Sequence, residues 1–132
     1  MALHAARRVA LQMIFARMFQ PEGCESVLLD QEDTGNIGED QGFIDNALAG
    51  TAQHLEDYNQ VIASLSPERA LDRIPALNKA ILYLSLHELA QQDALPRVIV
   101  NEAVELAKRF GDEADGRFIN GVLGNYLRMQ EP

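Results

Sequence analysis

The sequence is short of the features that mark several protein classes. It has a single cysteine, Cys24, which excludes an internal disulfide and fits a reducing compartment. No apolar run approaches the roughly 20 residues that a membrane span needs. The N-terminal stretch 1–19 is basic and then apolar, but Gln12 and Arg17 interrupt it and no small-residue cleavage site follows. We therefore expect an ordinary first helix, no membrane association and a cytoplasmic protein.

Groupings of residues that carry catalysis or bind metals are also missing. The histidines and Cys24 are scattered without metal-ligand spacing. The glycines of 35–42 lack the Lys-Ser/Thr sequence and the strand context of a phosphate-binding loop. Glu88 shares a helix face with apolar residues, so we expect it to be partly buried with Arg73 or a backbone amine as its partner. No second carboxylate or nucleophile pairs with Glu88, and we expect no enzyme, metal or cofactor.

Basic residues are unevenly distributed along the chain. Residues 18–68 contain no Lys or Arg and carry a charge of −11, whereas residues 1–17 carry +3 and residues 69–132 carry −1. The acidic segment repels anions, and the other two segments are neutral or basic enough for an anion to approach. A plain solvated acidic surface that keeps the chain soluble would give the same pattern.

Apolar residues recur at helical spacing, and strand-like alternation is absent. The spacing predicts helices over about 4–20, 43–64, 75–92, 96–110 and 114–129. Ser66, as an N-cap before Pro67, begins a further short helical turn. The 75–92 helix is apolar nearly all round, which predicts a central buried helix. Gly111 ends the 96–110 helix at the usual glycine position.

These elements predict an all-α fold, a compact bundle of about six to seven helices in a single domain covering 1–132. Its N-terminal half, about 1–65, includes an acidic loop at 22–42, and its C-terminal half covers about 66–132. Gly23, Gly35, Gly38 and Gly42 mark that acidic stretch as loop.

The last predicted helix carries glycines on the side away from its apolar face. On a helical wheel, Gly121 and Gly124 form a stripe with Arg117 and Arg128 at its two ends. A glycine in a helix interior costs roughly 1 kcal/mol relative to alanine. We expect the stripe to leave bare backbone that another chain can approach closely while the arginines hold an anion. Chance drift, or a second helix packed on this face, is the alternative.

Two blocks at the end of the chain, "NEAVELAKRFG" (101–111) and "GRFINGVL" (116–123), resemble the NusB family of bacterial transcription antitermination factors. The resemblance extends upstream to "LDRIPALNKAILYLSLHEL" (71–89), "FIDNALAGT" (43–51) and "ARRVALQMIF" (6–15). It implies a NusB-like fold of two small helical subdomains and no catalysis. It also implies binding of boxA-type single-stranded RNA of ribosomal RNA transcripts together with NusE, a ribosomal protein, in a complex that modifies RNA polymerase.

The resemblance further implies which residues contact RNA. The expected RNA-binding residues are His4, Arg7, Arg8, Asn78, Lys79, Tyr83, Arg117, Phe118 and Asn120. Aromatic rings would stack bases, asparagines would contact base edges, and cations would contact phosphates. For Phe118 a place in the core is the alternative, and for Asn120 a hydrogen bond to the local backbone.

The sequence departs from the family at several of these positions. His4 and Ala5 stand where the family is commonly basic, Tyr83 where it favours arginine, and Gly124 where aspartate is usual. These departures leave open a degenerate relative that binds a partner protein, or itself, but no RNA. The residues do not decide between a monomer and a homodimer.

The N-terminal segment has fewer basic residues than is usual in the family. We therefore expect RNA affinity to depend on the partner. With about three or four phosphate contacts, the affinity of the chain alone should fall about 30-fold between roughly 50 and 200 mM salt. NusE, being basic as ribosomal proteins generally are, should supply the missing positive charge. We expect a boxA-like RNA to bind the pair with NusE much more tightly than the chain alone in a fluorescence anisotropy titration over a salt series. Equal affinity with and without NusE would contradict this expectation.

Overall fold

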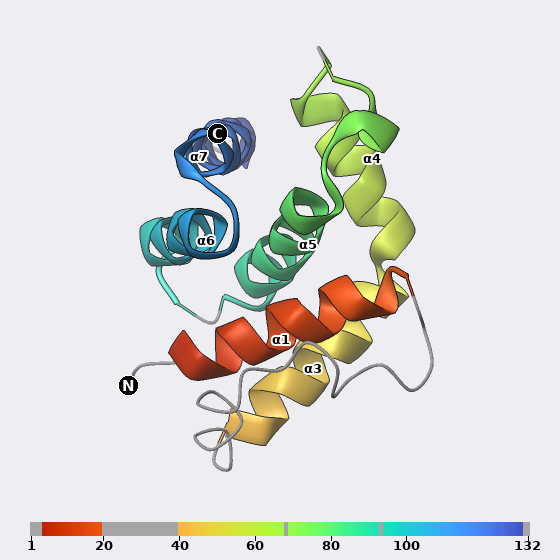
Figure 1. Cartoon of the computed structure of the whole chain (residues 1–132), viewed down its shortest axis with the longest axis vertical. Helices are drawn as coiled ribbons and strands as arrows, with labels where there is room; N and C mark the ends of the chain where they lie inside the picture. Colours follow the sequence, from red (N-terminus) through yellow and green to blue (C-terminus); the bar gives the residue numbers. More distant parts are fainter. Residues whose placement is uncertain (1–3, 20–39, 68, 93, 131–132) are drawn as a thin grey trace. The chain divides into compact units, whose positions relative to one another are not determined.

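The computed structural model describes residues 4–19, 40–67, 69–92 and 94–130 (Figure 1). Cys24 and nearly all of the expected acidic loop at 22–42 lie outside the described residues. Within the described ranges the chain forms six α-helices and one 3₁₀ helix and contains no strand. The predicted all-α class is therefore confirmed. In the same ranges, no helix combines the length and the apolar character that crossing a membrane requires.

The chain divides into two compact units, residues 1–53 and residues 54–132. The described part of the first unit consists of α1 (His4–Arg17) and α3 (Gln41–Gln53), which pack against each other. Both helices bury apolar side chains at helical spacing, among them Val9, Leu11, Ile14, Ile44, Ala47 and Leu48. The predicted first helix is thus confirmed.

The second unit contains α4 (Leu55–Leu65), the 3₁₀ helix η2 (Leu71–Arg73), α5 (Ala76–Gln91), α6 (Pro96–Phe110) and α7 (Glu113–Gln130). Helices α6 and α7 form a hairpin, both contact α5, and α4 contacts both α5 and α7 (Figure 1). Every residue of α5 from Ala80 to Glu88 is buried, which confirms the predicted central helix. The Glu88 side chain is only 2% exposed, and it has an interaction partner.

The single long helix predicted over 43–64 is wrong, because the chain leaves the helical conformation at His54. The backbone of His54 adopts φ −107° and ψ 18°, in the bridge region between helix and strand conformations. Leu55, the first residue after the break, is 42% exposed. The compact units divide at the same break; the halves expected at 1–65 and 66–132 stay a prediction.

Ser66 is not the predicted N-cap of a short helix but the residue that ends α4. Its N–H donates to the carbonyl oxygen of Ile62 at 3.1 Å, and its backbone leaves the helix with φ −133° and ψ 62°. Pro67 explains this position, because the residue before a proline is disfavoured in the helical region. A turn follows in which the Arg69 N–H donates to Ser66 O at 3.2 Å.

Candidate nucleic-acid interface

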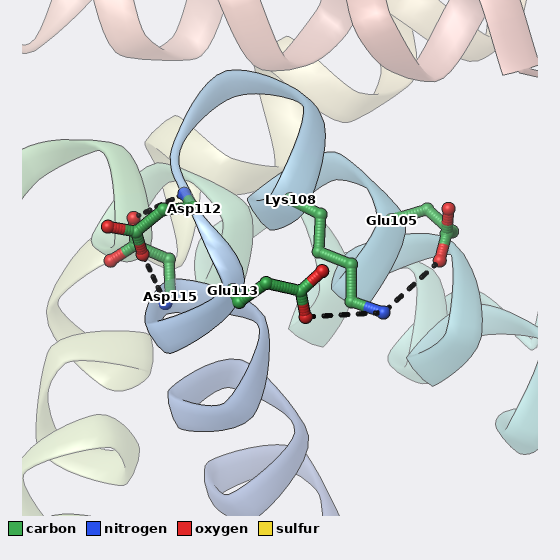
Figure 2. Close-up of polar contacts among 5 residues, drawn as sticks. All are labelled: Glu105, Lys108, Asp112, Glu113 and Asp115. Atoms are coloured by element: carbon green, nitrogen blue, oxygen red, sulfur yellow. Dashed lines mark hydrogen bonds and ion pairs between the residues drawn. The ribbon is translucent and has the colours of Figure 1, made fainter.

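The turn between α6 and α7 fixes the start of the last helix (Figure 2). Asp112 stands directly before α7, and its Oδ1 accepts the N–H of Asp115 at 3.0 Å. In return, Asp115 Oδ2 accepts the N–H of Asp112 at 3.0 Å. This reciprocal arrangement is a capping box, which satisfies backbone donors that a helix start leaves unpaired. It fixes the start of α7, and the side chains of Arg117 and Phe118 project from the helix one turn later.

Gly111 ends α6 as predicted. A glycine is required there because space is short, and not because the backbone is left-handed. Its N–H donates to Ala107 O at 2.8 Å, and its φ of −125° lies outside the left-handed region. A Cβ at position 111 would collide with the Asp115 carboxylate and would lie 2.9 Å from Ala107 O. The glycine therefore allows the close approach of the capping carboxylate.

Asn78 connects the start of α5 to the start of α7. Its Nδ2 donates to Asp115 Oδ1 at 3.1 Å, and the side chain is only 1% exposed. The buried Asn78 Oδ1 has no hydrogen-bond partner among the residues that the structure describes. Asn78 was expected to contact a base edge, which stays a prediction; in this structure it joins two helices and faces no solvent.

Tyr83, the expected stacking ring on α5, is enclosed. Its side chain is 4% exposed, and its hydroxyl donates to Asn59 Oδ1 on α4 at 2.5 Å. Burial raises the pKa of the Tyr83 phenol, and the hydrogen bond to Asn59 partly offsets that rise, so the hydroxyl stays protonated as a donor. The ring offers no open face to a base in this arrangement. Its neighbour toward the helix start, Lys79, is half-buried.

The expected RNA contacts in the first unit differ in exposure. His4 is exposed and Arg8 is half-buried, but Arg7 is only 5% exposed. The Arg7 guanidinium lies 6.0 Å from the centroid of the Phe43 ring, at the outer limit of a cation–π contact. Arg7 thus joins α1 to α3 in addition to any role toward a phosphate.

The glycine stripe of α7 faces outward as predicted. Gly121 is exposed, and a Cβ there would meet nothing within 4 Å. A Cβ on Gly124 would meet only Arg128 Nη1, at an ordinary contact distance of 3.7 Å. Gly116 is different: it is buried, and a Cβ there would lie 3.0 Å from Lys108 Cγ on α6. One glycine therefore lets the two helices pack closely, and the other two leave bare backbone.

The two arginines at the ends of the stripe differ in whether their guanidinium groups have hydrogen-bond partners. Arg117 is exposed, and within the described ranges its guanidinium makes no hydrogen bond or ion pair. Arg128 Nη2, by contrast, donates to Asn125 Oδ1 in the same helix. Asn120, between the two, is exposed. The end of α7 near Arg117 is therefore the better placed to receive an anion.

Phe118 is neither a core residue nor an open ring. It is half-buried, and the Arg69 guanidinium lies over its ring at 4.7 Å from the centroid. Sequence reasoning did not single out Arg69. The sequence feature that could have pointed to Arg69 is its position as the first basic residue after the acidic segment 18–68.

The family model of the NusB family matches residues 4–128. The chain belongs to the NusB family. The transcription antitermination protein NusB of Lysinibacillus sphaericus is 34% identical over 133 residues, which cover 98% of this chain and 100% of the relative. The NusB-like architecture is confirmed by two solved structures, both of which bear on the fold alone.

The first is T. maritima NusB, with a TM-score of 0.81 at 22% identity, covering 98% of this chain and 93% of that one. The second is a crystal structure of antitermination factors NusB and NusE in complex with double-stranded RNA. It has a TM-score of 0.74 at 20% identity, and the match covers 96% of each chain.

The capping box predicts unequal effects for two neighbouring acidic residues. Asp112→Ala should lower the free energy of unfolding by about 1 kcal/mol, because the Asp115 N–H loses its acceptor. The matched control is Glu113→Ala: Glu113 contributes an exposed ion pair to Lys108 with an N–O distance of 3.9 Å. Such pairs are worth about 0–1 kcal/mol. Urea unfolding followed by circular dichroism measures both, and equal losses would contradict the capping role.

Two glycines of α7 should respond unequally to replacement by alanine. Gly121→Ala should raise the free energy of unfolding by up to about 1 kcal/mol, because it gains helix propensity and its Cβ meets open space. Gly116→Ala should bring no such gain, because Lys108 must move. Thermal unfolding of the two variants checks this contrast. A loss of stability in Gly121→Ala would show that the stripe is covered in the folded protein.

Proposed function

We propose that this chain is a cytoplasmic transcription antitermination factor that acts by binding, without catalysis. It binds boxA-type single-stranded RNA of ribosomal RNA transcripts jointly with NusE, within the complex that modifies RNA polymerase. The observation that carries the proposal is membership of the NusB family over residues 4–128, with a relative named transcription antitermination protein at 34% identity over its full length. A solved relative of the same fold was crystallised with NusE and double-stranded RNA.

The chemistry around the start of α7 supports an RNA ligand. The exposed guanidinium of Arg117 can donate to a phosphate, and the neighbouring Asn120 can both donate to and accept from a base edge. The helix end itself disfavours an anion, because the carboxylates of Asp112 and Asp115 lie there and accept the N–H groups of Asp115 and Asp112. Phosphate contacts must therefore come from side chains, which makes the individual arginines decisive.

A single strand fits this surface better than a duplex does. Side chains read single strands by stacking unpaired bases on aromatic rings or guanidinium planes and by bonding their edges. The surface around Phe118 offers such groups, with Arg69 over the ring and Arg117 beside it in the sequence. In a duplex the base faces are hidden, so the Phe118 ring and the Arg69 guanidinium would have no base to stack on.

The charge of the chain supports a basic partner. A net charge of −9 repels RNA at long range, whereas a basic ribosomal protein such as NusE would be attracted to the chain and would offset that repulsion. In the first unit, Arg7 and Arg8 are the cations expected to contact phosphate, and His4 stands near them in the sequence. Arg7 contributes less than its charge implies, since it is mostly enclosed over Phe43.

A second function remains in competition, that of a protein-interaction module without RNA binding. The enclosure of Arg7, Asn78 and Tyr83 favours it, because three of the nine expected RNA contacts are buried. The two functions differ in one measurable property, which is the affinity for boxA-like RNA in the presence of NusE.

Charge reversal at the start of α7 tests the proposal. Arg117→Glu should weaken binding of a boxA-like RNA to the pair with NusE about tenfold near 0.1 M salt, and should reduce the salt slope by about 0.7 or more. The control is Arg97→Glu, because Arg97 is also exposed but lies at the opposite end of the α6–α7 hairpin. Fluorescence anisotropy measures both variants.

The three possible results have distinct meanings. Loss in Arg117→Glu with near-normal binding in Arg97→Glu supports the proposal. Equal loss in the two variants would mean that only net charge matters, and the assignment of this face would fail. Absence of RNA binding by the unaltered chain with NusE would leave the protein-interaction module as the function.

A further inference from the structure

The contact between Arg69 and Phe118 joins two segments that are far apart in the sequence. The guanidinium carbon of Arg69 lies 4.7 Å from the Phe118 ring centroid, well within the range of about 6 Å for a cation–π contact. The corresponding distances for Arg7 with Phe43 and Arg109 with Phe110 are longer, at 6.0 and 5.8 Å. Arg69 thus covers the ring that was expected to stack a base.

Short hydrogen-bonded turns hold the backbone of Arg69 in place. Its N–H donates to Ser66 O at 3.2 Å, in the turn that follows α4. Directly after it, the Arg73 N–H donates to Ala70 O at 2.9 Å and begins η2. Because these bonds already order the backbone at Arg69, less backbone entropy is lost when the residue binds a ligand.

The guanidinium of Arg69 keeps its capacity for a ligand. Arg69 is exposed, and its guanidinium forms no hydrogen bond or ion pair with any residue that the structure describes. A guanidinium has five N–H donors at its edge and a flat face that stacks on rings. The guanidinium lies over Phe118, and its side away from the ring and its N–H groups remain available to a ligand.

We propose that Arg69 is an RNA-binding residue of this chain, and that its guanidinium, supported by the Phe118 ring, provides the plane on which a base of the single strand stacks. This inference rests on the proposed function and names a contact within it that the sequence resemblance did not supply. Phe118 then contacts the side of the guanidinium away from the base and orients it. The edge of Arg69 donates to the phosphate next to the stacked base.

The test compares two substitutions at position 69 in the pair with NusE. Arg69→Lys keeps the charge but removes the plane, so affinity for a boxA-like RNA should fall about 5- to 50-fold with an unchanged salt slope. Arg69→Ala removes both, so affinity should fall at least as far and the slope should decrease by about 0.7. Arg97→Ala, which removes an exposed arginine at the far end of the hairpin, should stay within about twofold of the unaltered chain.

A fluorescent base reports stacking directly. In a boxA-like RNA with 2-aminopurine placed at each position in turn, one position should be quenched on binding to the unaltered pair. That quenching should be lost in both Arg69 variants. Phe118→Leu should reproduce the loss, and combining it with Arg69→Ala should add little, because the two side chains form one platform.

Each other outcome overturns the inference in an identifiable way. Normal affinity and quenching in Arg69→Lys would show that the charge alone matters. Normal affinity in Arg69→Ala together with a lowered melting temperature would reduce the contact to a stabilising role. If the unaltered pair binds RNA and Arg117→Glu weakens it while the Arg69 variants do not, this inference fails and the proposed function stands. If the unaltered pair does not bind RNA, both fail.

Discussion

The arrangement of the second unit depends on one carboxylate, that of Asp115. Its Oδ2 accepts the N–H of Asp112 and completes the cap of α7, while its Oδ1 accepts the amide of Asn78 at the start of α5. The same group takes up the space that a side chain at position 111 would need. One side chain thus ends α6, starts α7 and ties both to the central helix. These contacts fix the start of α7, one turn before Arg117 and Phe118, and the buried apolar residues of α7 hold the rest of the helix.

Much of the fold could be predicted from the sequence because its helices have regular apolar spacing. The buried α5 followed from apolar residues on all sides, and the open stripe on α7 followed from the position of Gly121 opposite the apolar face. The break at His54 could not be predicted in this way. Its neighbours are all acceptable in a helix, and the sequence contains no proline or glycine at that point. The break shows in the exposure of Leu55, which depends on what packs around it and not on local propensity.

The candidate site was predictable only where side chains point to solvent. Arg117 and Asn120 are exposed as expected, since the helical wheel fixes their side of α7. Asn78 and Tyr83 are enclosed by tertiary packing. Their hydrogen-bond partners, Asp115 and Asn59, lie 37 and 24 residues away in the sequence. Pairings at such separations follow from tertiary packing, which periodicity does not encode. The contact of Arg69 with Phe118 across the second unit escaped detection for the same reason.

At Gly121, a change that stabilises the helix would also reduce the space open to a ligand. A methyl group at this position would strengthen α7, and the same methyl group would fill space that the proposed nucleotide strand would approach. Selection for a more rigid helix and selection for tighter contact therefore act on the same atom with opposite signs. In a relative that did not bind the ligand, a larger residue at this position would stabilise the helix at no cost to binding.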